Sequence, residues 1–84
     1  ALEQNYPNTF NPSTVIRYQL PVDSWVTLKI YNVLGEEVET LVDELQVAGF
    51  KSQEWIPTSL PSGVYIYRLN AGNFTDVKRL LLIK

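Results

Sequence analysis

Apolar and polar residues alternate through much of the chain, which is the pattern of strands that bury one face. Residues 14–20, 25–32 and 64–70 show the alternation most clearly. Pro21 ends the first of these runs, since proline cannot donate to a strand ladder. The residues expected to share a face are Thr14, Ile16, Tyr18 and Leu20 in the first run, Val26, Leu28 and Ile30 in the second, and Tyr65, Tyr67 and Leu69 in the third.

Turn signals separate these runs from weaker ones. Gly35, Ala48-Gly49 and Gly72-Asn73 predict tight turns, the last of them a hairpin. Residues 51–55 predict a polar strand, and residues 74–84 predict a closing strand or strand pair. Residues 36–45 also fit a helical period, but their position between strands favours a strand.

About seven short strands at near-regular spacing predict an all-β fold, an immunoglobulin-like antiparallel β-sandwich. The chain has 84 residues, which is enough for one small domain. It contains no cysteine, so no disulfide can reinforce the thin core. We therefore expect aromatic residues, among them Trp25, Tyr31 and Trp55, to supply much of the stability.

Composition also narrows the function. The absence of histidine and cysteine removes the commonest general base, zinc ligands and nucleophile pairs, so we expect no enzyme, no cofactor and no metal. The net charge of −2 offers no basic field for nucleic acid. The longest apolar stretch, residues 80–83, is far too short to cross a membrane, and the first residues do not resemble a signal peptide.

Several blocks of the sequence, in order, resemble one known family. The chain opens QNYPNTFNPST at residues 4–14 and continues with VTLKIYNVLG at 26–35. It then has VETLV at 38–42, AG at 48–49, SGVYIYRL at 62–69 and a closing KRLLLIK at 78–84. These blocks resemble the C-terminal sorting domains of the type IX secretion system, which exports proteins across the outer membrane of Bacteroidetes and related phyla.

The resemblance implies that residues 1–84 form a single sorting domain at the C-terminus of a longer secreted protein. Its partners would be the outer-membrane translocon, sortase-like components and the preceding cargo domain, and its location the exterior or cell surface of a Gram-negative bacterium. In this family the closing strands are read by the export machinery. The residues that the resemblance assigns to recognition are Gly63, Tyr65, Tyr67, Arg68, Gly72, Lys78 and Lys84.

The chain departs from the family pattern at a few positions. Thr9 stands for the usual proline, Lys51 for histidine, Gln53 for valine, and Ile56 for an aspartate that often follows the tryptophan. The loop at 57–61 is also shorter than in the family. These departures lie outside the closing strands.

Other functions remain open from the residues alone. Trp25, Tyr31 and Trp55 could form an aromatic platform for sugar rings, as in an accessory carbohydrate-binding module of a secreted glycoside hydrolase. An immunoglobulin-like domain also serves as a structural part of flagellar hook-capping proteins, so a spacer role is a further alternative. The acidic residues of 36–44 could bind calcium, although such a run is more typical of a solvated face or a protected edge strand.

The asparagine- and proline-rich opening segment predicts an ordered loop. We expect its asparagine side chains to cap backbone groups, and Tyr6 and Phe10 to plug the open edge of the sandwich. Asn73-Phe74-Thr75 matches an N-glycosylation acceptor, but its place in a tight hairpin explains the asparagine without a sugar.

Overall fold

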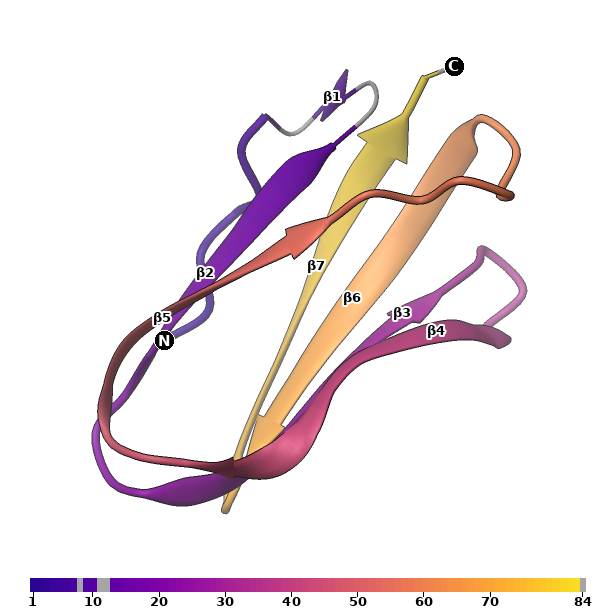
Figure 1. Ribbon diagram of the computed structural model, residues 1–84. Coiled ribbons are helices and arrows are strands. Elements are labelled where there is room, and N and C mark those ends of the chain that lie inside the picture. The colour runs from indigo at the N-terminus through magenta and orange to yellow at the C-terminus, as the bar shows by residue number, and fades with distance from the viewer. Residues whose placement is uncertain (8, 11–12, 84) are drawn as a thin grey trace.

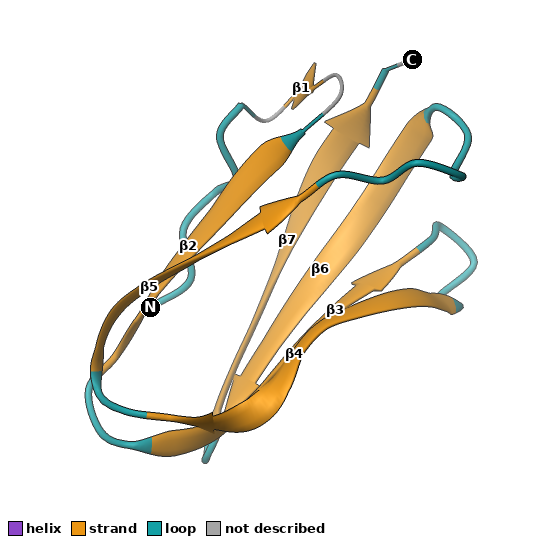
Figure 2. Cartoon of the chain, viewed as in Figure 1, coloured by secondary structure: helices purple, strands orange, loops and turns teal. Residues whose placement is uncertain are grey.

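Two β-sheets lie face to face in the computed structural model, which describes residues 1–7, 9–10 and 13–83 (Figure 1). Strands joined by loops and turns make up this described part (Figure 2). The all-β class and the sandwich architecture predicted from the sequence are therefore confirmed. The strands are β1 (Thr9–Phe10), β2 (Thr14–Leu20), β3 (Ser24–Tyr31), β4 (Glu37–Gln46), β5 (Gly49–Trp55), β6 (Gly63–Ala71) and β7 (Phe74–Leu82).

The larger sheet has the strand order β1-β7-β6-β3-β4, and the smaller one pairs β2 with β5. All of these pairs are antiparallel except that of β1 with β7, which is parallel and joins Thr9 and Phe10 to the end of β7. The opening segment extends the smaller sheet, because Leu2 and Tyr6 bridge to β2 and the backbone N–H of Tyr6 donates to Val15 at 3.0 Å. One short segment thus touches both sheets.

The core lies between the sheets and follows the predicted alternation. Ile16, Tyr18 and Leu20 of β2 face Val26, Leu28 and Ile30 of β3, and all of them are buried. On β6 the same alternation buries every second residue. The remaining core is Leu2, Val42, Trp55, Tyr65, Tyr67, Leu69, Ala71, Leu80 and Leu82.

Residues 37–46 form a strand, so the helical alternative for this segment is wrong. Its alternation is interrupted, because the register with β3 shifts between Leu28 and Lys29 and again between Ile30 and Tyr31. The shifts leave Val38 and Leu41 without a direct partner, and both side chains pack against the core. The extra residue of a β-bulge thus lets Leu41 pack inward like its neighbour Val42.

Tight turns connect the strands where glycine allows a positive φ. Gly35 has φ 83° in the turn after β3, and the Asn32 side chain accepts hydrogen bonds there from the N–H groups of Leu34 and Glu36. Gly72 has φ 60° and begins the two-residue turn between β6 and β7. Glycine in the first central position is typical of a type II′ hairpin. The closing segment is thus one strand, not a strand pair.

The aromatic contribution to the core differs from the expectation in part. Trp55 is 1% exposed, whereas Trp25 is 59% exposed on the outer face of the larger sheet. Trp25 therefore adds little to the core. The Tyr6 backbone bridges to β2, but its side chain is 74% exposed and so does not plug the sandwich. The side chain of Phe10 lies outside the described residues.

Candidate functional site

The β6–β7 hairpin carries most of the residues that the sequence assigned to recognition. Gly63 begins β6, Gly72 makes the turn, and Lys78 lies opposite Tyr67 on β7. Lys78 is half-buried, and Arg68 is exposed. Lys84 lies outside the described residues.

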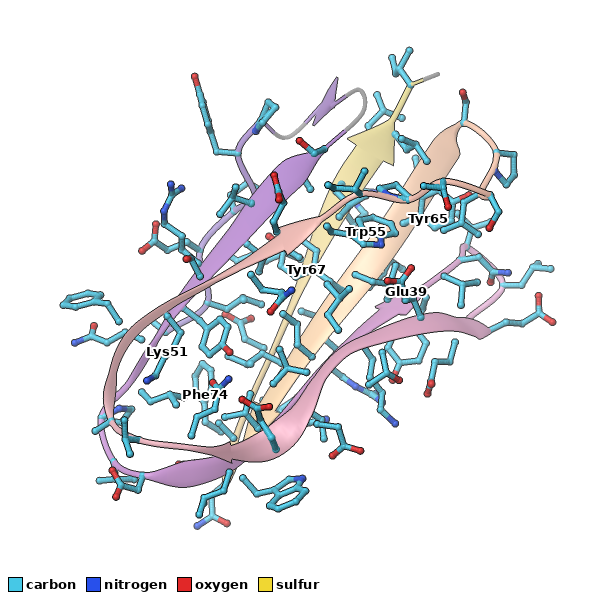
Figure 3. All side chains as sticks on the ribbon, in the orientation of Figure 1. Glu39, Lys51, Trp55, Tyr65, Tyr67 and Phe74 are labelled. Carbon is cyan, nitrogen blue, oxygen red and sulfur yellow. The ribbon has the colours of Figure 1, made fainter. Side chains whose placement is uncertain are left out.

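Tyr65 and Tyr67 are buried, so a partner cannot contact their rings in the folded domain. They are 5% and 0% exposed, respectively. The alternation along β6 turns them into the core, and Figure 3 shows Tyr65 next to Trp55. These rings are therefore placed to hold the hairpin in the fold, and a part for them in recognition would have to be indirect.

The Tyr67 hydroxyl connects the hairpin to the opening segment. It donates to the backbone oxygen of Glu3 at 2.8 Å and accepts from the backbone N–H of Asn5, also at 2.8 Å. Burial raises the pKa of Tyr67 to about 12, so the hydroxyl keeps its proton. A single side chain thus joins the two sheets by polar contacts through the core.

Asn5 extends this network toward β2. Its side-chain amide donates to the backbone oxygen of Pro7 at 2.8 Å and to the hydroxyl of Thr14 at 2.9 Å. That hydroxyl in turn donates to Pro7 O at 2.7 Å. Asn5 and Thr14 are the two buried polar residues of the described part, and both are satisfied. The expected capping by asparagine is thus confirmed at Asn5, while its link to Tyr67 had no signal in the sequence pattern.

Trp55 and Tyr65 form an aromatic pair next to this network, because Trp55 lies opposite Thr14 in the smaller sheet. Their rings meet edge to face with centroids 6.0 Å apart, as Figure 3 shows in the interior. The indole N–H donates to the Glu39 carboxylate at 3.0 Å, and the Tyr65 hydroxyl donates to Pro61 O at 2.7 Å. These contacts tie β4, β5 and the loop before β6 together.

Gln4 lies against the outer edge of β7. Its side-chain amide donates to the backbone oxygen of Arg79 at 2.6 Å. In the antiparallel pair with β6, Arg79 lies opposite Ile66, between the hydrogen-bonded positions set by the hairpin turn. Its carbonyl therefore points to the edge, and Gln4 satisfies it there.

The outer face of the larger sheet carries the exposed basic residues of β6 and β7. Arg68 lies over the Tyr31 ring, with its guanidinium carbon 4.9 Å from the ring centroid, and donates to the Tyr31 hydroxyl at 2.6 Å. Arg79 follows on β7, diagonal to Arg68. Val64, Ile66 and Val77 are the apolar neighbours of these arginines on the same face, and the sequence analysis did not single them out. The alternation within SGVYIYRL groups Val64 and Ile66 with Arg68, but it does not tell which face of β6 is exposed.

The aromatic platform proposed for sugar rings does not form. Trp55 is in the core, and Tyr31 is half-buried beneath Arg68. Trp25 is exposed, with its indole N–H donating to Asp43 at 2.8 Å. One exposed ring on one face is not the set of rings that the platform requires.

The acidic residues of β4 are engaged in local contacts. The Thr40 hydroxyl donates to Glu37, Lys29 pairs with Glu37 at 3.2 Å, and these contacts lower the pKa of the Glu37 carboxyl. Glu39 and Asp43 accept from the two indoles. Within the described residues, no group of three or more acidic side chains is arranged to hold a metal ion. Because β4 is an edge strand, its charges also oppose pairing with another sheet.

Together, these contacts define a small β-sandwich whose closing hairpin is tied to the opening segment. The chain belongs to the family of secretion system C-terminal sorting domains, whose family model matches residues 4–84. The resemblance to type IX sorting domains is thus confirmed over nearly the whole chain. No curated protein and no solved structure matched it. Among the described residues, no helix could span a membrane.

Proposed function

We propose that residues 1–84 form a non-catalytic address for the protein to which they are attached. The domain directs that cargo to the type IX translocon in the outer membrane, and from there to the cell surface or the medium of a Gram-negative bacterium. Sortase-like components then act on the exported protein. The observation that carries this proposal is the match of the sorting-domain family over residues 4–84.

The structure supports recognition of a folded domain rather than of a linear peptide. The closing strand is not a free tail, because Leu80 and Leu82 are in the core and β7 pairs with β6 along its whole length. Tyr67 also ties the hairpin to the opening segment. A translocon component that reads the last two strands therefore meets the outer face and the turn of the hairpin, where Arg68 and Gly72 are exposed. Lys78 lies opposite Tyr67 on the inner face and is half-buried.

Fusion of residues 1–84 to a periplasmic reporter enzyme tests the proposal. The fusion is expressed in a bacterium that has the type IX system and in the same strain without its translocon, with the reporter alone as control. We expect reporter activity outside the cell only for the fusion in the intact strain. Retention of the fusion in the periplasm of the intact strain, at normal expression, would refute the sorting role.

A further inference from the structure

The outer face of the larger sheet combines positive charge with an apolar floor. We call this surface the cationic face. It is formed by residues of three neighbouring strands, which the cross-strand register places side by side. They are Lys29 and Tyr31 of β3, Val64, Ile66 and Arg68 of β6, and Val77, Arg79 and Leu81 of β7.

The positive charges on this face lower the stability of the folded domain where they repel one another. Lys29 and Arg68 are direct cross-strand partners, and like charges in that position repel. Glu37 offsets the charge of Lys29, and the Tyr31 ring offsets that of Arg68. Arg79 forms no ion pair with any residue that the structure describes. A partner that supplies negative charge here would relieve the repulsion.

Two shallow hollows lie next to these arginines. The first is lined by Arg79 with Val64, Leu80 and Leu81. The second is lined by Arg68 with Tyr31, Gly35, Ile66 and Val77. Each hollow therefore pairs a guanidinium, which suits a carboxylate, with aliphatic side chains.

The spacing of the hollows fits an extended chain. Val77 and Leu81 are four residues apart on one face of β7, which is about 13 Å along a strand. A bound segment in extended conformation covers that distance with about four residues, and places alternate side chains on the face. The net charge of −2 disfavours a long polyanion or an anionic membrane, whereas a short segment meets only the local charges.

We propose that the cationic face binds a short, extended, acidic segment of a partner protein, whose carboxylates meet Arg68 and Arg79 while aliphatic side chains enter the hollows. This inference rests on the proposed sorting function, because it names the chemistry of the partner that reads the hairpin. It also assigns to Arg68 the direct contact with a partner that Tyr65 and Tyr67 cannot make, because their side chains are buried.

Titration of the isotope-labelled chain with a model peptide tests this inference without any export assay. The probe is a capped nine-residue peptide of alternating valine and glutamate, and the readout is the set of backbone amide shifts in nuclear magnetic resonance. We expect shifts at residues 64–68 and 77–81. The Arg68→Gln/Arg79→Gln double variant is expected to bind about tenfold more weakly, because it loses two solvent-exposed charge pairs and each of them contributes about threefold.

Arg17→Gln is the control for each of the two substitutions, because Arg17 is exposed on β2 of the smaller sheet and its replacement removes one positive charge, as each of them does. We expect it to bind like the parent chain, with the amide spectra showing that all variants are folded. Higher salt should weaken the parent's binding. Three results would overturn the inference. They are equal binding of a valine–lysine peptide, amide shifts confined to other strands, and no binding at about 1 mM peptide. Shifts of these amides with phosphatidylglycerol vesicles but not with the peptide would also overturn it. None of these outcomes decides whether the reporter fusion is exported, so the two proposals fail separately.

Discussion

Replacement of Tyr67 by phenylalanine removes one oxygen atom from the core and keeps the ring. That oxygen contacts two backbone groups of the opening segment, the N–H of Asn5 and the carbonyl of Glu3. Asn5 is 2% exposed, so its N–H has no access to water when the hydroxyl is gone. The variant thus tests whether the polar link between the hairpin and the opening segment stabilises the fold.

The expected loss follows from these contacts. A buried donor left unsatisfied costs about 1–3 kcal/mol, and the bond to Glu3 adds about 1 kcal/mol. We therefore expect Tyr67→Phe to lower the free energy of unfolding by about 2–4 kcal/mol. In a domain of this size, that loss corresponds to a fall of about 10–20 °C in the thermal midpoint.

Thermal and urea unfolding followed by circular dichroism measure the loss. Tyr65→Phe is the matched control, because it makes the same change two residues away and loses one bond, to Pro61 O at the loop. We expect that control to lose only about 1 kcal/mol. Hydrogen exchange of the Asn5 amide should accelerate in Tyr67→Phe alone. Equal losses in the two variants, or a loss below about 0.5 kcal/mol in Tyr67→Phe, would refute the reasoning.

Two further predictions concern burial. Trp55→Ala is expected to lower the free energy of unfolding by about 3–5 kcal/mol, because it leaves a cavity in the core. Trp25→Ala truncates an exposed ring and should lower it by less than about 1 kcal/mol. Urea unfolding measures both losses, and similar losses would contradict the assignment of Trp55 to the core. Burial raises the pKa of Tyr67 to about 12, so the folded state holds a proton that the unfolded state releases above pH of about 10. The free energy of unfolding should therefore fall as the pH rises from about 10 to about 12, and it should fall less steeply in Tyr67→Phe. An unchanged pH dependence in that variant would assign the effect to other groups, such as Tyr18, whose pKa is also raised by burial.

The strands and turns could be predicted because they depend on local patterns. Alternation located β2, β3 and β6, and glycine marked the turns at Gly35 and Gly72. The pattern could not predict the two register shifts of β4, since a bulge depends on how the partner strand is placed. Val38 and Leu41 therefore lie on positions that simple alternation does not give.

The site was less predictable for a related reason. Alternation groups Tyr65 with Tyr67, and Val64 with Arg68, but it does not say which group faces the core when both contain large apolar residues. Only the position of the smaller sheet decides this. The role of Asn5 was similarly out of reach, because its partner Tyr67 is 62 residues away in the sequence.

The central claim is that the export machinery reads a folded sandwich. The most direct test is the exported fraction of reporter fusions that carry Trp55→Ala or Trp25→Ala, relative to the parent fusion at equal cellular amounts. We expect Trp25→Ala to be exported like the parent, and Trp55→Ala to lose export in proportion to the fraction of domain that is unfolded at the growth temperature. Full export of Trp55→Ala, with that domain shown to be unfolded, would contradict the account and assign the signal to a linear segment.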